Sequence, residues 1–173
     1  LPADEGDPYE HGLESMKNGD YQLALEHFQQ ALLENPERAE IRLAMSRAAL
    51  ASGDLESSKQ LLDSIPADSP EYLSAKNLKQ LFVLAEFRGD EGMITDRLKE
   101  DPRDVDAWYR QGVNQALNGH FEPACESFLK VVSLDRSYED DAGRRALVLI
   151  FEVLGVEHEI TALFRRTLAS YLF

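Results

Sequence analysis

The residues of this chain that could do chemistry are one cysteine, four histidines and a large number of carboxylates. The histidines are His11, His27, His120 and His158. None has a partner at the short spacing, such as His-x-x-x-His, that puts two imidazoles on one helix face for a metal ion. Carboxylate pairs such as Asp140 with Asp141 follow from the acidic composition, and we interpret them as solvated helix starts. The sequence therefore predicts no metal site.

The cysteine, Cys125, follows Ala124, which we expect in a helix core. A reactive thiol needs an electropositive setting, and the neighbouring Glu122 and Glu126 provide the opposite. We therefore expect a structural, partly buried thiol. The sequence also lacks a Gly-rich phosphate loop and a Gly-x-Ser-x-Gly turn. We expect no enzymatic activity and no cofactor.

Composition and charge limit the partners that the chain can have. With 43% hydrophobic and 29% charged residues among 173, the sequence is typical of a soluble globular protein. Eighteen basic residues against 32 acidic ones give a net charge of −14. Binding to nucleic acid or to an anionic membrane surface depends on basic groups and is not expected. The longest apolar run, 146–151, is far shorter than the roughly 20 residues that span a bilayer.

The first residues resemble a linker. The acidic opening, 1–12, lacks the charged and apolar regions of a signal peptide. Because the chain starts with Leu rather than Met, we interpret residues 1–7 as a linker that follows another part of a longer protein. A single cysteine cannot form a disulfide within the chain, which fits a reducing compartment, so we expect a cytoplasmic location.

A glycine followed by a residue suited to start a helix recurs along the chain. These turns are Gly19-Asp20, Gly53-Asp54, Gly89-Asp90 and Gly119-His120. The first two glycines are 34 residues apart, and the last follows the second by 66 residues, close to two such periods. Each glycine can take the left-handed conformation that ends a helix, and each aspartate can cap the next one. The repeat predicts pairs of antiparallel helices joined by short turns.

Small and large residues alternate as such pairs require. Gly12, Ala24, Gly112 and Ala124 would let backbones approach, and Phe28, Leu62 and Phe128 would fill the space between neighbouring pairs of helices. We predict an all-α chain of about ten antiparallel helices. Their expected ranges are 8–18, 21–34, 38–52, 55–63, 70–88, 91–100, 104–118, 121–134, 139–154 and 157–172.

These residues resemble the tetratricopeptide repeat, a 34-residue pattern with a tryptophan, a Leu-Gly step, alanines, an aromatic residue and a proline. Residues 5–38 supply Gly12, Ala24, Phe28, Ala31 and Pro36, and residues 105–138 supply Trp108, Gly112, Ala124 and Phe128. Residues 39–66 and 69–102 are degenerate copies, and 139–173 add a final helix pair. The resemblance implies a tetratricopeptide-repeat-like solenoid over 8–173, whose concave face binds other proteins.

A narrower resemblance covers the whole chain. The acidic start, the degenerate repeats and the closing segments 143–147, 153–155 and 164–172 resemble the C-terminal half of the bacterial thioredoxin-like chaperedoxins, the CnoX or YbbN family. Members carry a thioredoxin fold before the repeats, hold unfolding clients during oxidative stress and pass them to the GroEL chaperonin and the DnaK system. The resemblance implies that this chain is the repeat half, without the N-terminal thioredoxin-like domain.

In this type of repeat, defined positions of the first helix of each pair line the groove. They predict a client-binding groove of Tyr9, Leu13, Met16, Leu43, Arg47, Leu50, Tyr109, Val113 and Leu117. Members that grip the C-terminal carboxylate of Hsp70 or Hsp90 have Lys and Asn where Tyr9, Leu13 and Ala44 stand here, so no carboxylate clamp is expected. An apolar groove suits exposed hydrophobic segments of a client. The alternative is a groove covered by the preceding domain or by curvature of the array.

The last helix is the second candidate surface. Its residues 160–172 carry an apolar stripe at helical spacing, and the chain ends in Tyr171-Leu172-Phe173. The stripe either docks inward as a cap or inserts into a partner, and the resemblance implies a contact with the chaperonin. The predicted chaperonin-docking residues are Phe164, Arg165, Arg166, Leu168, Tyr171, Leu172 and Phe173.

The sequence thus predicts a protein-binding domain that holds unfolding clients and docks to GroEL, as half of a chaperedoxin. The alternative function is a scaffold that joins fixed partners in a cytoplasmic assembly without chaperone action. The two differ in one observation. A holdase suppresses aggregation of several unrelated proteins, whereas a scaffold binds one partner in a defined ratio.

Overall fold

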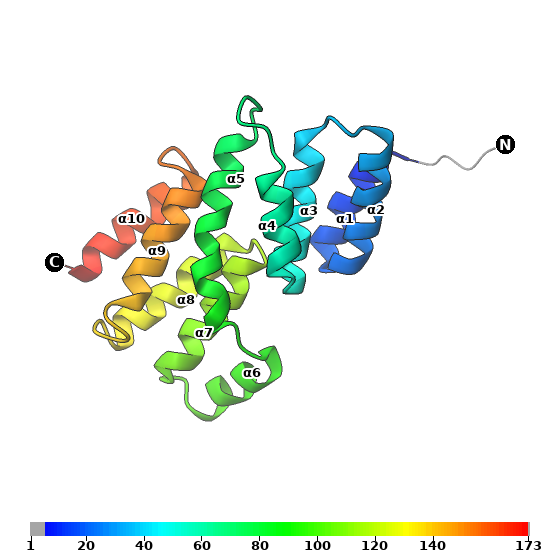
Figure 1. The fold of residues 1–173 in the computed structure, drawn as a ribbon. Helices are drawn as coiled ribbons and strands as arrows, with labels where there is room; N and C mark the ends of the chain where they lie inside the picture. Colours follow the sequence, from blue (N-terminus) through cyan, green and yellow to red (C-terminus); the bar gives the residue numbers. More distant parts are fainter. Residues whose placement is uncertain (1–5, 173) are drawn as a thin grey trace. The chain divides into compact units, whose positions relative to one another are not determined.

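The computed structural model describes residues 6–172, and the regular structure in that range is helical throughout (Figure 1). In chain order the elements are α1 (Pro8–Asn18), α2 (Tyr21–Glu34), α3 (Ala39–Ser52), α4 (Leu55–Asp63), α5 (Tyr72–Lys79), η1 (Gln80–Phe87), α6 (Glu91–Glu100), α7 (Val105–Leu117), α8 (Phe121–Leu134), α9 (Ala142–Leu154) and α10 (Glu159–Leu172). Here η1 is a 3-10 helix, and the others are α-helices. The predicted all-α chain is confirmed.

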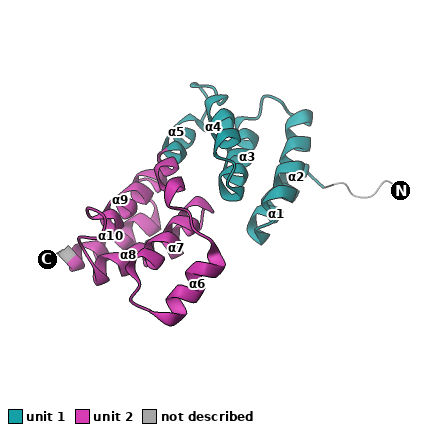
Figure 2. Ribbon diagram, turned by 60° about the horizontal axis from the view of Figure 1, so that its bottom comes forward, with its two compact units in different colours: residues 1–79 teal, residues 80–173 magenta. Residues whose placement is uncertain are grey.

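The chain divides into two compact units, residues 1–79 and residues 80–173 (Figure 2). Unit 1 contains α1 to α5, and unit 2 contains η1 and α6 to α10. In unit 1, each helix from α1 to α4 packs against the next one. In unit 2, α7 packs against η1, α6 and α8, while α9 and α10 pack against α8 and against each other. Within each unit, neighbours in sequence are therefore neighbours in space.

Three of the four turn glycines adopt the predicted conformation. Gly19, Gly53 and Gly119 have φ of 79°, 92° and 80°, the left-handed region in which a helix ends. The prediction for Gly89 was wrong, because its φ is not positive. Its amide and carbonyl are held instead by the side chain of Asn114 on α7, at 3.1 and 2.8 Å.

The predicted aspartate caps are present in two of three helices. Asp54 accepts a hydrogen bond from the amide of Ser57 at 3.0 Å, and Asp90 accepts one from Met93 at 2.8 Å. These bonds satisfy amides that have no partner within the helix. Asp20 makes no such side-chain bond, so α2 starts without a side-chain cap.

Close contact between a glycine and a phenylalanine ring sets the spacing of the helices in two pairs. A Cβ added to Gly12 on α1 would lie 2.4 Å from the Phe28 ring on α2, and one added to Gly112 on α7 would lie 2.7 Å from the Phe128 ring on α8. Both rings are fully buried. The close approach of the backbones predicted at Gly12 and Gly112 is therefore confirmed, whereas the rings, predicted to fill the space between pairs, contact a glycine within their own pair.

The predicted helix over 70–88 is two elements, α5 and η1. Three apolar residues of η1 recur every third position: Leu81 and Leu84 are buried, and Phe87 is half-buried. A 3-10 helix has three residues per turn, so this spacing puts all three side chains on one face. The predicted α-helix, with 3.6 residues per turn, would spread these three side chains over a wider part of the helix surface.

The predicted start of the helix over 139–154 was also wrong, because α9 begins at Ala142. Glu139, Asp140 and Asp141 have φ of 45°, 55° and 65°. L-residues pay roughly 1–2 kcal/mol each for this left-handed conformation, so tertiary contacts must hold the segment. Two are present: Arg145 Nη2 donates to the Glu139 carbonyl at 2.9 Å, and Arg144 pairs with Asp141.

Gly112→Ala tests the packing of the α7–α8 pair. Alanine gains about 1 kcal/mol over glycine in a free helix, but here the new Cβ overlaps the Phe128 ring. We expect a net loss of about 1–3 kcal/mol in the free energy of unfolding, measured by urea denaturation.

The matched control is the same change in a Phe128→Leu background. The smaller side chain leaves room for the methyl group, so the loss caused by Gly112→Ala should shrink. A protein at least as stable as wild type after Gly112→Ala alone would contradict the packing account.

Candidate functional site

An apolar groove with a volume of about 400 Å³ lies in unit 2 between η1, α7 and α9. We call it the η1–α9 groove. Its lining residues are Val83, Leu84, Glu86, Phe87, Tyr109, Glu139, Ala142, Arg145, Ala146 and Leu149. Val83 is 62% exposed, whereas Leu84, Ala142 and Ala146 are buried. The groove thus has an apolar interior and at least one large apolar side chain in contact with solvent.

Tyr109 on α7 lies at the floor of the groove and is only 4% exposed. Its ring centroid is 5.5 Å from that of Phe87, and 5.6 Å from those of Phe128 and Tyr138. Burial raises the pKa of its hydroxyl. Because aromatic rings at this separation attract each other, the floor of the groove is a packed aromatic cluster.

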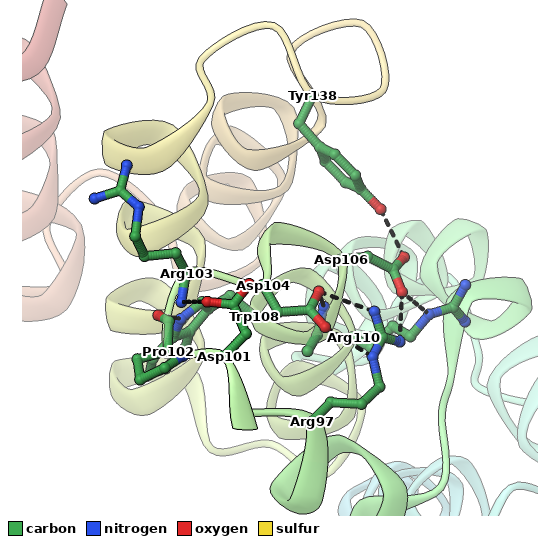
Figure 3. A network of polar contacts seen from close by, with 10 residues as sticks. Arg97, Asp101, Pro102, Arg103, Asp104, Asp106, Trp108, Arg110 and Tyr138 are labelled. Atoms are coloured by element: carbon green, nitrogen blue, oxygen red, sulfur yellow. Dashed lines mark hydrogen bonds and ion pairs between the residues drawn. The ribbon is translucent and has the colours of Figure 1, made fainter. Parts of the chain in front are cut away.

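A polar network holds the loop beside this cluster (Figure 3). Both oxygens of Asp106 accept hydrogen bonds: Arg97 Nη1 and Arg110 Nε donate to Oδ2 at 2.8 and 2.9 Å, and the Tyr138 hydroxyl donates to Oδ1 at 2.8 Å. Arg97 also donates to both oxygens of Asp104 at 2.8 Å. Three segments that are separate in sequence, α6, α7 and the turn before α9, therefore meet at one carboxylate.

The hydrogen bonds leave Asp106 firmly ionised. Burial on its own would raise the pKa of this carboxyl, but the bonds from Arg110, Tyr138 and Arg97 outweigh burial and lower the pKa to about 2. The pKa of Tyr138 is raised by burial and by its bond to Asp106. The phenol therefore keeps its proton and stays a donor at neutral pH.

Three charged groups stand at the mouth of the groove. Glu86 extends from η1, Glu139 from the turn before α9, and Arg145 from α9, and all three are exposed. All three residues belong to the lining of the same groove. The mouth thus combines two carboxylates with one guanidinium.

The sequence-predicted groove residues are divided between the two units, and Tyr109 is the member that lines the η1–α9 groove. Val113 and Leu117 on the same helix are buried, as are Leu43 and Leu50 on α3. These four side chains contribute to the core in this structure.

The other predicted groove residues lie in unit 1. Tyr9, Leu13 and Met16 on α1 are half-buried and pack against the core around Phe28. Arg47 on α3 is exposed, although enough protein surrounds it to lower the pKa of its guanidinium by desolvation. These four residues therefore remain partly accessible to solvent.

The predicted chaperonin-docking residues divide between the core and the surface. Phe164 and Leu168 are buried on α10, which packs against α8 and α9. Arg165, Arg166 and Tyr171 are exposed. The side chain of Leu172, and Phe173 as a whole, lie outside the described residues. Of the predicted apolar stripe, Phe164 and Leu168 therefore pack against the rest of unit 2 as a cap would, and Tyr171 remains at the surface.

Sequence reasoning missed nine of the ten lining residues, all except Tyr109: Val83, Leu84, Glu86, Phe87, Glu139, Ala142, Arg145, Ala146 and Leu149. The three-residue spacing of Leu81, Leu84 and Phe87 is the signal that could have oriented η1. No local signal places Glu139, because the left-handed backbone is usual for glycine and the segment 139–141 contains none.

The structure shows little that could serve catalysis. Cys125 is buried, and burial together with Glu122 and Glu126 raises its pKa to about 12. His11 and His27 stand on adjacent helices with ring centroids 5.5 Å apart, a proximity that the sequence spacing did not reveal. In the described part of the chain, no three His, Cys, Asp or Glu residues cluster in a way that could hold a metal ion. Within the same part, no helix has the length and hydropathy needed to cross a membrane.

Comparisons with known sequences define the class of protein. Two tetratricopeptide repeat profiles match, one over residues 85–173 and the other over residues 15–81. The chain therefore belongs to the tetratricopeptide repeat family. Domains of this family are typically non-catalytic scaffolds, and this chain is a protein–protein interaction domain with the predicted tetratricopeptide-like fold.

Other comparisons add little. No curated protein matches the sequence. Among solved structures, the crystal structure of a domain of a protein of unknown function from Vibrio parahaemolyticus is 20% identical. The alignment covers 96% of this chain and 99% of that chain, with a TM-score of 0.41. A likeness at this level carries no argument about function.

Asp106→Asn tests the polar network. The folded pKa of about 2 lies below the ordinary value of 3.8. The stabilisation is therefore complete above pH 4 and is lost as the pH falls through 2. We expect the variant to lose about 1–2 kcal/mol of unfolding free energy at pH 7, and the difference from wild type to shrink between pH 4 and pH 2.

The control is Asp96→Asn, which removes a carboxylate from an exposed pair with Lys99. This change should alter the unfolding free energy by less than about 0.5 kcal/mol at any pH. A pH-independent difference between wild type and Asp106→Asn would show that the carboxylate charge is not what stabilises this site.

Proposed function

We propose that this domain holds exposed apolar segments of unfolding proteins in the η1–α9 groove, as the client-binding half of a cytoplasmic, thioredoxin-like chaperedoxin. The observation that carries the proposal is the open apolar groove, with Val83 62% exposed above the aromatic floor formed by Tyr109. Unfolded clients differ from folded proteins in exposing large apolar side chains, and such a groove can bury them.

The size of the groove supports binding of a few side chains rather than a large surface. Its volume of about 400 Å³ lies in the usual range for ligand sites. Burying one large apolar side chain contributes roughly 1.5–3 kcal/mol, so one or two anchors give weak, reversible binding. Weak binding suits a protein that holds a client and then releases it.

Unit 1 adds the partly accessible residues of the predicted groove to the proposal. Tyr9 carries the guanidinium of Arg38 over its ring at 5.0 Å, and Leu13, Met16 and Arg47 are also partly accessible. These residues offer a second apolar and aromatic surface to a client. The buried residues Leu43, Leu50, Val113 and Leu117 contribute instead to the cores of the two units.

The exposed side of α10 is proposed to dock to the GroEL chaperonin, with transfer to the DnaK system, as the family resemblance implies. Arg165 and Arg166 are exposed cations on an acidic protein, and the same helix exposes Leu163 at 52% and Tyr171 at 47%. An exposed mixture of apolar and cationic groups is suited to a transient protein contact. In the same proposal, Phe164 and Leu168 fasten α10 to the core.

The competing function is a scaffold for fixed partners, and the family assignment is equally compatible with it. Light scattering by several heat-unfolded proteins separates the two. If the domain suppresses the aggregation of several unrelated clients at an equimolar or lower concentration, the result supports the holdase. Tight binding of one folded partner without suppression supports the scaffold.

Val83→Glu tests the groove. The side chain is exposed, so the fold should persist, but a carboxylate in the apolar wall should weaken client holding several-fold. The measurement is suppression of light scattering by a heat-unfolded client. The control is Val156→Glu, which makes the same change at a residue with the same 62% exposure outside the groove lining. Equal activity of the two variants would remove the groove from the proposal.

Arg165→Glu with Arg166→Glu tests docking by α10. Both side chains are exposed, so the melting temperature should change little, whereas binding to purified GroEL should fall about ten-fold or more through charge repulsion. The control is Arg103→Glu with Arg136→Glu, which makes the same charge change at exposed residues outside α10. Unchanged binding to GroEL by the α10 variant would end the docking proposal.

A further inference from the structure

We infer that the η1–α9 groove selects apolar segments flanked by lysine or arginine, and that Glu86 and Glu139 make this selection. The inference rests on the proposed function, because it specifies which apolar segments the groove accepts. Its basis is the juxtaposition of two exposed carboxylates, from two separate walls, at the opening of an apolar pocket.

The two carboxylates are free to receive a cation. Within the described part of the chain, neither Glu86 nor Glu139 takes part in an ion pair, whereas nearby Asp106 and Asp141 are bound to arginines. Arg145, the remaining charged group at the mouth, donates a hydrogen bond to the Glu139 carbonyl. It is therefore partly engaged by the backbone and does not neutralise either carboxylate in a contact.

The position of Glu139 is held from both sides. Tyr138 donates to Asp106 in the polar network, and Arg145 binds the Glu139 carbonyl. The residue has a φ of 45°, a conformation that costs free energy for a residue other than glycine. Strain of this kind persists where the surroundings over-determine it, and it is concentrated at binding sites. Glu139, held in this way, is one of the residues that line the groove.

The sign of the charge favours a cationic flank. A segment with an acidic flank would meet the carboxylates of Glu86 and Glu139, and a single guanidinium, that of Arg145, which already binds a carbonyl. The net charge of −14 on the whole chain would repel it as well. A segment with a basic flank would place its cation between Glu86 and Glu139 while its apolar side chain enters the pocket. Because both carboxylates are exposed, water and salt screen the attraction, and the selectivity is moderate rather than absolute.

The experiment uses three labelled peptides that share a central Leu-Phe pair and carry two Lys, two Gln or two Glu residues beside it. Fluorescence anisotropy gives their affinities for the full chain. We expect the Lys peptide to bind about five- to ten-fold more tightly than the Gln peptide at low salt, and the Glu peptide to bind most weakly. Raising the salt concentration should remove most of the difference.

Glu86→Gln with Glu139→Gln should abolish the preference for the Lys peptide, so that the Lys and Gln peptides bind the variant with equal affinity. The control is Glu122→Gln with Glu126→Gln, which removes two exposed carboxylates from α8, outside the groove lining. This control should keep the preference within about two-fold. Circular dichroism confirms that both double variants are folded.

The outcomes separate this inference from the proposed function. If the Lys and Gln peptides bind equally, or if the α8 control loses the preference as completely as the groove variant, the charge selection is wrong and the apolar groove remains. If the Glu peptide binds most tightly and Arg145→Gln abolishes that binding, the groove is instead a site for acidic segments. If none of the peptides binds, both the inference and the proposed groove fail.

Discussion

The contact between Gly112 on α7 and the Phe128 ring on α8 is the constraint on which the candidate site depends. A Cβ at Gly112 would lie 2.7 Å from the ring, so the two helices can approach this closely only with glycine at this position. The same ring packs against Tyr109, with 5.6 Å between centroids. The packing that joins the helix pair therefore also supports the floor of the η1–α9 groove. Gly12 and Phe28 repeat the contact in unit 1.

The walls of the groove depend on a different kind of interaction. The turn before α9 has a left-handed backbone that its own sequence does not favour. Hydrogen bonds from Tyr138 to Asp106, and from Arg145 to the Glu139 carbonyl, supply the tertiary contacts that hold it. Apolar packing against Phe128 thus positions Tyr109 at the floor of the groove. A charge-assisted hydrogen bond from Tyr138 to Asp106 positions the turn that forms one wall.

Charge and exposed apolar surface balance each other in this domain. Val83, Leu163 and Tyr171 expose large apolar groups that could promote self-association. A net charge of −14 opposes that association through mutual repulsion between molecules. The acidic composition therefore counteracts self-association of these apolar groups, and under the proposed function it favours clients that carry positive charge beside their apolar segments.

The sequence by itself determined the all-α class, the pairing of helices and most helix ends, because these follow from local signals. Gly19 and Gly53 end helices through their own left-handed backbone, and the spacing of Gly12 with Phe28 encodes a contact between adjacent helices. Only the tertiary structure decided which predicted groove residues stay accessible, since Val113 and Leu117 lie on the same helix as Tyr109 yet are buried in the core. It also decided the 3-10 geometry of η1 and the backbone of Glu139. The turn that contains Glu139 is tied to α7 by the hydrogen bond from Tyr138 to Asp106, which are 32 residues apart, and no local pattern of residues records the free energy of that contact.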